Sequence, residues 1–156
     1  EINAANTEGL TLALRVPSWC HGILRVQVNE EDVASPVIKD GFLYFKEGLD
    51  QAVITIFFKN LLHTEALADI PELTAILDGP IVLAGMTDKD TGIRGDMAHP
   101  ESFLAPRNEH TYETYPWQQN HYSTRNQDIN FELKPLYEVM DEAYTVYFTA
   151  KQDKSC

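Results

Sequence analysis

The residue types best suited to acid–base chemistry gather near the end of the chain, where Glu138, Asp141 and Glu142 lie close together. Hydrolysis of a glycosidic bond uses two such carboxyl groups, held ~5–9 Å apart. The sequence spacing sets no such separation, and a chain with 24 acidic residues forms clusters of this kind by chance. A solvated turn before the last strand is therefore favoured, and a hydrolase that uses these carboxylates is the weaker alternative.

Metal-binding residue types occur, but not at the spacing of a preset site. His99, His110 and His121 are eleven residues apart, without the helical or paired-cysteine spacing that fixes zinc geometry. Cys20 and Cys156 form no Cys-x-x-Cys pair, and two free thiols are favoured over a disulfide between them. We therefore expect no metal ligand and no cofactor in this chain.

Aromatic residues in loop-like sequence form a further group of candidates. The apolar faces of such rings stack on sugars, and aromatic residues are also enriched in protein interfaces. An interface with another domain is favoured, and a carbohydrate-binding module is the alternative. The residues concerned are Trp19, Tyr112, Tyr115 and Trp117, of which the last three would form the sugar-binding surface.

The chain that must position these residues is acidic and has 156 residues. Its formal net charge of −12 argues against nucleic acid and against an anionic membrane surface as partners. The hydrophobic content of 44% indicates a globular protein with a buried core. The chain does not begin with Met, and we expect it to be a piece of a longer protein.

Alternation of apolar and polar residues predicts an all-β protein, an antiparallel, jelly-roll-like β-sandwich or two small sandwich modules. The expected division is residues 1–62 and residues 63–156, with a long loop at 86–110 in the second module. The strand at 51–58 carries apolar residues at almost every position and is expected to be buried on both faces or nearly so. The other expected strands are 11–16, 23–28, 42–45, 81–84, 128–133 and 144–148, and residues 63–69 are expected to form either a strand or a helical turn.

Several segments together resemble the β-L-arabinofuranosidase family of glycoside hydrolases, long catalogued as a domain of unknown function. The matching segments are Leu14–Trp19 (L-R-V-P-S-W), Val28-Asn29, Gly41–Tyr44 (G-F-L-Y), Asp78–Ala84 (D-G-P-I-V-L-A) and the closing block Lys134–Phe148. Their order and spacing cover residues 10 to 149, and the closing block is the most specific.

The sequence departs from the family pattern at several places. Glu30 replaces the glycine of the V-N-G turn, which suggests a different turn type. Ala143 replaces an arginine of the closing block. The W-x-x-G-D turn expected after Gly41–Tyr44 is also absent. These changes affect local turns and one side-chain contact rather than the expected fold.

The resemblance implies a non-catalytic role for this chain. In that family the catalytic residues lie in an N-terminal (α/α)6 barrel, with a zinc-bound cysteine as nucleophile and a glutamate as acid/base, and no position here matches them. The chain corresponds to the C-terminal β-sandwich region, which is expected to brace the barrel of the parent chain and to assist formation of a homodimer. An exposed apolar docking face would accompany that role. Tyr137, Tyr144 and Tyr147 are expected to anchor the last strand.

Overall fold

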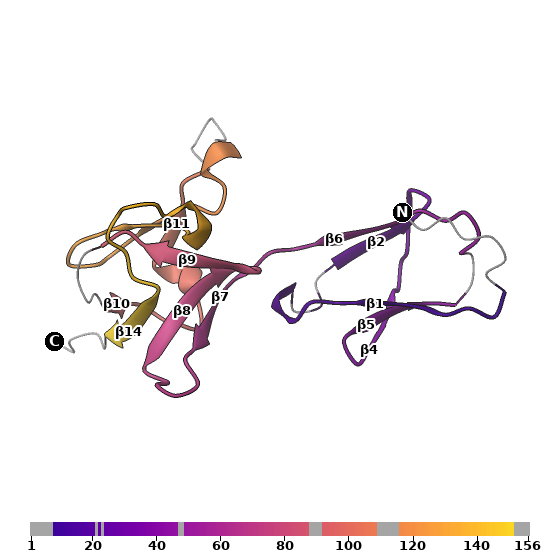
Figure 1. The fold of residues 1–156 in the computed structure, drawn as a ribbon, viewed down its shortest axis with the longest axis horizontal. Coiled ribbons are helices and arrows are strands. Elements are labelled where there is room, and N and C mark those ends of the chain that lie inside the picture. The colour runs from indigo at the N-terminus through magenta and orange to yellow at the C-terminus, as the bar shows by residue number, and fades with distance from the viewer. Residues whose placement is uncertain are drawn as a thin grey trace. The chain divides into compact units, whose positions relative to one another are not determined.

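The computed structural model describes residues 8–20, 22, 24–46, 49–87, 92–108 and 116–151. Within them the chain is built from short strands and four single turns of 3-10 helix, η1 to η4, which confirms the all-β class. The chain divides into two units, Glu1–Asn60 and Leu61–Cys156. Each unit is described separately (Figure 1).

The first unit contains two three-stranded antiparallel sheets, in the orders β1-β5-β4 and β3-β2-β6. Leu43 of the first sheet and Val26 of the second are buried in one cluster with Val16 and Cys20. A core between two sheets is the arrangement of a sandwich. The elements are β1 (Leu12–Arg15), η1 (Ser18–Cys20), β2 (Leu24–Val28), β3 (Glu31–Asp32), β4 (Val37–Lys39), β5 (Phe42–Phe45) and β6 (Ile54–Phe58).

The turn between β2 and β3 has Glu30 at the position where a glycine was expected. Val28 pairs with Glu31, so the loop has two residues. Asn29 and Glu30 both have positive φ, 50° and 69°, as a type I′ turn requires. The Asn29 side chain also accepts a hydrogen bond of 2.8 Å from the backbone N–H of Val53, which ties the turn to the neighbouring segment.

The expectation that the strand at 51–58 is buried on both faces is wrong. Phe57 is 48% exposed, and Phe58 is also exposed. The reason is that β6 belongs to a small sheet whose partner strand, β2, alternates between the core and solvent. The Arg25 guanidinium lies 5.5 Å from the centroid of the exposed Phe57 ring.

The second unit is one extended sheet with the order β10-β14-β8-β9-β13-β12-β11, and β7 pairs with β8. The described pairs are antiparallel except β10 with β14. The elements are β7 (Leu62–Ala66), β8 (Leu73–Asp78), β9 (Ile81–Gly85), β10 (Ile93–Arg94), η2 (Pro100–Ser102), β11 (Leu104–Pro106), η3 (Pro116–Gln118), β12 (Tyr122–Thr124), β13 (Glu132–Pro135), η4 (Leu136–Glu138) and β14 (Tyr147–Lys151).

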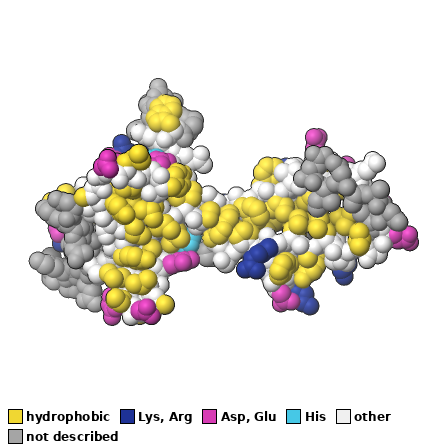
Figure 2. Space-filling view, in the orientation of Figure 1, with side chains coloured by type: hydrophobic (Ala, Val, Ile, Leu, Met, Phe, Trp, Pro, Cys, Tyr) yellow, Lys and Arg dark blue, Asp and Glu magenta, His cyan; other side chains and the backbone are white. Residues whose placement is uncertain are grey.

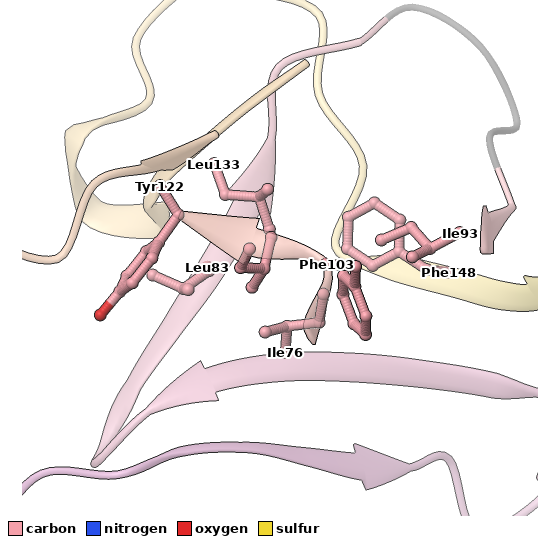
Figure 3. Packing of buried hydrophobic residues seen from close by; sticks show 8 residues of the cluster. Ile76, Leu83, Ile93, Phe103, Tyr122, Leu133 and Phe148 are labelled. Carbon is pink, nitrogen blue, oxygen red and sulfur yellow. The ribbon is translucent and has the colours of Figure 1, made fainter. Parts of the chain in front are cut away.

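Every strand from β8 to β14 contributes one side chain to the core of this unit (Figure 3). The Tyr122 hydroxyl reaches out of this cluster and donates a hydrogen bond of 2.7 Å to the buried carboxylate of Asp78. The core residues are Ile76, Leu83, Ile93, Phe103, Leu104, Tyr122, Leu133 and Phe148.

Three segments of the second unit differ from the sequence-based expectations. Residues 86–110, expected as a long loop, contain β10, η2 and β11 and bury Ile93, Phe103 and Leu104. The apolar residues there enter the core singly between turns, so they show no periodicity. The strand expected at 128–133 starts only at Glu132, and Ile129 is 70% exposed. The last strand begins at Tyr147 rather than residue 144.

Candidate functional site

An open groove of about 560 Å³ lies over the strands β11, β12 and β13 of the second unit. Its size is within the usual range for small-molecule sites, about 300–1,000 Å³. The turn η3, drawn in orange in Figure 1, extends from these strands and supplies part of the groove wall. The lining residues are Ala105, Pro106, Arg107, Trp117, Gln118, Ser123 and Glu132.

The register of the three strands builds the floor of this groove. Ala105 pairs with Ser123, and Ser123 pairs with Glu132, so these residues lie in one row across the sheet. Side chains alternate between the two faces of a strand. The adjacent pair Tyr122 and Leu133 is buried, and the row with Ser123 therefore faces away from the core.

The groove combines an ion pair with an exposed indole. Arg107 forms a salt bridge with Glu132 across the outward face. The Trp117 side chain is 72% exposed, although it belongs to a 3-10 turn that is fixed at its end, where the His121 N–H donates to the Gln118 carbonyl at 3.1 Å. The site therefore offers one large apolar surface beside donors and acceptors on a strand-supported floor.

One carboxylate of the acidic cluster near the end of the chain, Glu142, is paired with a cation. Glu142 accepts hydrogen bonds from Lys134 Nζ at 2.5 Å and from the Met140 backbone N–H at 2.8 Å. These bonds, with the Lys134 bond as the larger cause, lower the pKa of Glu142 to about 2. A general acid needs the opposite shift, so Glu142 is suited to holding its segment in place rather than to donating a proton.

Two of the three candidate histidines, His99 and His121, have local partners. The two nitrogens of His121 contact the Gln119 carbonyl at 2.9 Å and the Glu138 carboxylate at 3.0 Å, which are both acceptors. His99 lies 3.3 Å from Glu101, and His110 lies outside the described residues. Over the described ranges, no group of three or more His, Cys, Asp or Glu side chains is placed to hold a metal ion.

The other candidates belong to the first unit or lie outside the described residues. Trp19 is half-buried in the first unit, where its ring meets Phe58 edge-on with centroids 5.6 Å apart. Cys20 is buried and free, and its thiol donates to the Pro17 carbonyl at 3.0 Å. Three further candidates, Tyr112, Tyr115 and Cys156, belong to the residues that the structure does not describe.

A second surface of the same unit is apolar. Five large side chains from η4 to the start of β14 are exposed, with Met140 at 82% and Tyr137 at 70%; the others are Leu136, Tyr144 and Tyr147. Tyr137, Tyr144 and Tyr147, which were expected to anchor the last strand, all have exposed side chains. Figure 2 shows hydrophobic side chains gathered on the visible face of this unit. We refer to residues 136–147 as the closing segment.

Within the described ranges no helix is long and apolar enough to cross a membrane. No family model matches the sequence, and no curated protein matches it. Solved structures do match the fold, and three glycoside hydrolases of much greater length are among them.

A β-L-arabinofuranosidase of glycoside hydrolase family 127 from Geobacillus stearothermophilus T6 is 18% identical, with a TM-score of 0.59. The match covers 90% of this chain and 26% of that enzyme. A second family 127 β-arabinofuranosidase is 15% identical over 90% of this chain and 28% of its own, with a TM-score of 0.61. A third protein, described as a glycoside hydrolase, is 13% identical over 96% and 29%, with a TM-score of 0.60.

These matches confirm the fold that the sequence motifs led us to expect. The chain has the fold of a β-rich part of such enzymes and spans between 26% and 29% of their length. At identities of 18% or less the likeness concerns the fold, and function is argued from the surfaces described above.

Proposed function

We propose that this chain is a non-catalytic accessory β region of a glycoside hydrolase that acts on β-L-arabinofuranosides. One observation carries the proposal: nearly all of this chain matches only about a quarter of a β-L-arabinofuranosidase. A catalytic domain elsewhere in a longer parent protein would supply the nucleophile and the acid/base. The β region would brace that domain and contribute to a homodimer.

The closing segment is suited to the bracing role. Its exposed Tyr137, Met140 and Tyr144 provide apolar surface that is stabilised when it is removed from water. Glu142 fixes the segment to β13 through Lys134, so the surface is held in shape before a partner binds. We propose that the helical barrel of the parent chain packs on this surface.

Hydrolysis of an aryl β-L-arabinofuranoside, with and without added zinc, tests the non-catalytic role. We expect no turnover by the chain of 156 residues and turnover by the longer parent protein. Turnover by this chain alone would overturn the proposal. Glu138→Gln would then be the first variant to assay, because Glu138 lies in the acidic cluster.

A matched pair of substitutions tests the docking surface in the parent protein. Met140→Glu places a charge in the proposed interface, whereas Ile129→Glu places one at a similarly exposed position outside the closing segment. Burial of an unpaired charge should lower the stability of the parent by about 2 kcal/mol or more for Met140→Glu alone. In the isolated chain both variants should unfold as the wild type does. Equal effects of the two variants in the parent would refute the assignment of the surface.

Carbohydrate binding is a second candidate function. The observation that favours it is the groove, which joins the exposed Trp117 to a polar floor containing Ser123 and Glu132. An aromatic platform beside a few placed polar groups is a common form of small-molecule site. This function and the bracing role use different surfaces, so one chain can perform both.

A further inference from the structure

We propose that the groove over β11, β12 and β13 binds a neutral oligosaccharide, with one sugar ring on the Trp117 indole and its hydroxyl groups on Ser123 and the Arg107–Glu132 pair. The assignment rests on the carbohydrate-binding function proposed above. It specifies which residues form the site and which class of glycan the site accepts.

The position of Trp117 is the first argument. Exposing an indole of this size to water costs stability, yet 72% of the Trp117 side chain is exposed beside an open groove. The flat apolar ring offers area with few rotatable bonds, which limits the entropy lost on binding. A pyranose or furanose ring presents C–H groups on one face, and that face is complementary to an indole.

The polar floor is the second argument. A sugar hydroxyl both donates and accepts hydrogen bonds, so a site for a pair of hydroxyls needs both functions. Arg107 and Gln118 supply N–H donors, whereas Glu132 and Ser123 supply oxygen acceptors. The Arg107–Glu132 salt bridge holds both charged groups in position before a ligand enters, so little ordering is left to be done on binding.

The charges select against acidic glycans. Among the described lining residues, Arg107 is the one with a cationic side chain, and it is paired with Glu132. A uronate carboxylate would have to compete with Glu132 for that guanidinium. The net charge of −12 opposes the approach of a polyanion as well. A neutral glycan avoids both costs.

Calorimetric titration of the chain with neutral oligosaccharides tests the proposal. The probes are arabino-, xylo- and cello-oligosaccharides, with an oligogalacturonate as the acidic comparison. We expect a dissociation constant in the millimolar to micromolar range for at least one neutral probe. Trp117→Ala should weaken it roughly tenfold or more, and Trp117→Phe should retain most of it. Ile129→Ala, an equally exposed apolar site away from the groove, is the matched control.

A second groove variant keeps the proposal testable if Trp117→Ala fails to fold. Ser123→Phe fills the floor of the groove while leaving Trp117 in place, and it should also abolish binding. Urea unfolding of each variant shows whether the fold is retained. Both variants should lose binding at wild-type stability.

The possible outcomes distinguish a wrong assignment of the site from a wrong assignment of carbohydrate binding. If the wild type binds none of the probes, carbohydrate binding and the site fail together. If a neutral glycan binds and both groove variants bind it as tightly as wild type, the function stands and this site is wrong. Equal or tighter binding of oligogalacturonate would overturn the neutral class. Loss of parent stability on Trp117→Ala, of the size expected for Met140→Glu, would assign the groove to the interdomain interface instead.

Discussion

Gly85 is the position at which one added methyl group should have the clearest effect on the second unit. It is the last residue of β9 and pairs with Leu133. The rings of Phe131 and Phe148 stack over it, with centroids 5.9 Å apart and planes at 17°. A Cβ atom at residue 85 would lie 2.8 Å from Phe131 Cε2 and 2.8 Å from Phe148 Cζ. Both distances are well inside van der Waals contact.

The size of the effect follows from the packing. Phe148 is fully buried and has no room to retreat, so the ring pair or the strand must shift. Overpacking of this kind costs about 1–3 kcal/mol. Alanine also restricts the unfolded chain relative to glycine, which offsets about 0.4–1 kcal/mol of the loss. We expect Gly85→Ala to be destabilising by about 1–2 kcal/mol, or a decrease of roughly 0.5–1 M in the urea midpoint.

A double-mutant cycle checks the physical reason. Phe131→Leu removes the aromatic atom nearest to the new methyl group, so it should relieve part of the clash in the Gly85→Ala background. Urea unfolding followed by circular dichroism measures all four proteins, and the coupling energy should exceed about 0.5 kcal/mol. A Gly85→Ala protein that unfolds at the wild-type urea concentration would refute the reasoning. Strictly additive losses would show that Phe131 is not the obstacle.

Two further predictions concern polar contacts of the same unit. Tyr122→Phe removes the hydroxyl that donates to the buried Asp78 carboxylate, and it should cost about 1–3 kcal/mol in urea unfolding, whereas the exposed Tyr137→Phe should leave the midpoint unchanged. The hydrogen bond from Lys134 lowers the pKa of Glu142 from 4.5 to about 2. A lowered carboxyl pKa stabilises the fold above pH 4.5. This contribution to stability should disappear as the pH falls from 4.5 through 2. Glu142→Gln should therefore flatten the pH dependence of the thermal midpoint between pH 4.5 and 2, and an unchanged slope would contradict the assignment.

Strands with a complete alternating pattern were predictable from the sequence. Leu12 and Leu14 of β1, and Leu24 and Val26 of β2, occupy alternate positions and turn inward in the structure. Such strands contain two or more periods, so the pattern identifies both the element and its buried face. A different signal identified β9, where a short run of apolar residues follows the break at Asp78-Gly79-Pro80.

The short strands could not be found in this way. β10 has two residues and β11 and β12 have three each, which is about one period of alternation. They exist because distant partners complete their hydrogen bonds, as when Ala105 pairs with Ser123. Pro106 in β11 donates no backbone hydrogen bond, and it is tolerated because β11 lies at the edge of the sheet.

The same limit applies to the groove. Trp117 was recognised because an aromatic residue in loop-like sequence is unusual whatever its partners are. Arg107 and Glu132 carried no signal, since either residue alone is an ordinary surface charge. Their meeting depends on the β11–β12–β13 register, which no local pattern encodes.

Strand β13 links the two proposed surfaces. Glu132 and Lys134 are two positions apart, so they share the outward face; Glu132 lines the groove and Lys134 holds the closing segment through Glu142. A substitution within β13 would disturb both surfaces, so it would not distinguish the role of the groove from that of the closing segment. Trp117→Ala and Met140→Glu each alter one surface at an exposed side chain, so glycan binding should respond to the first and parent stability to the second. That reciprocal pattern is what two independent functions on one sheet face require.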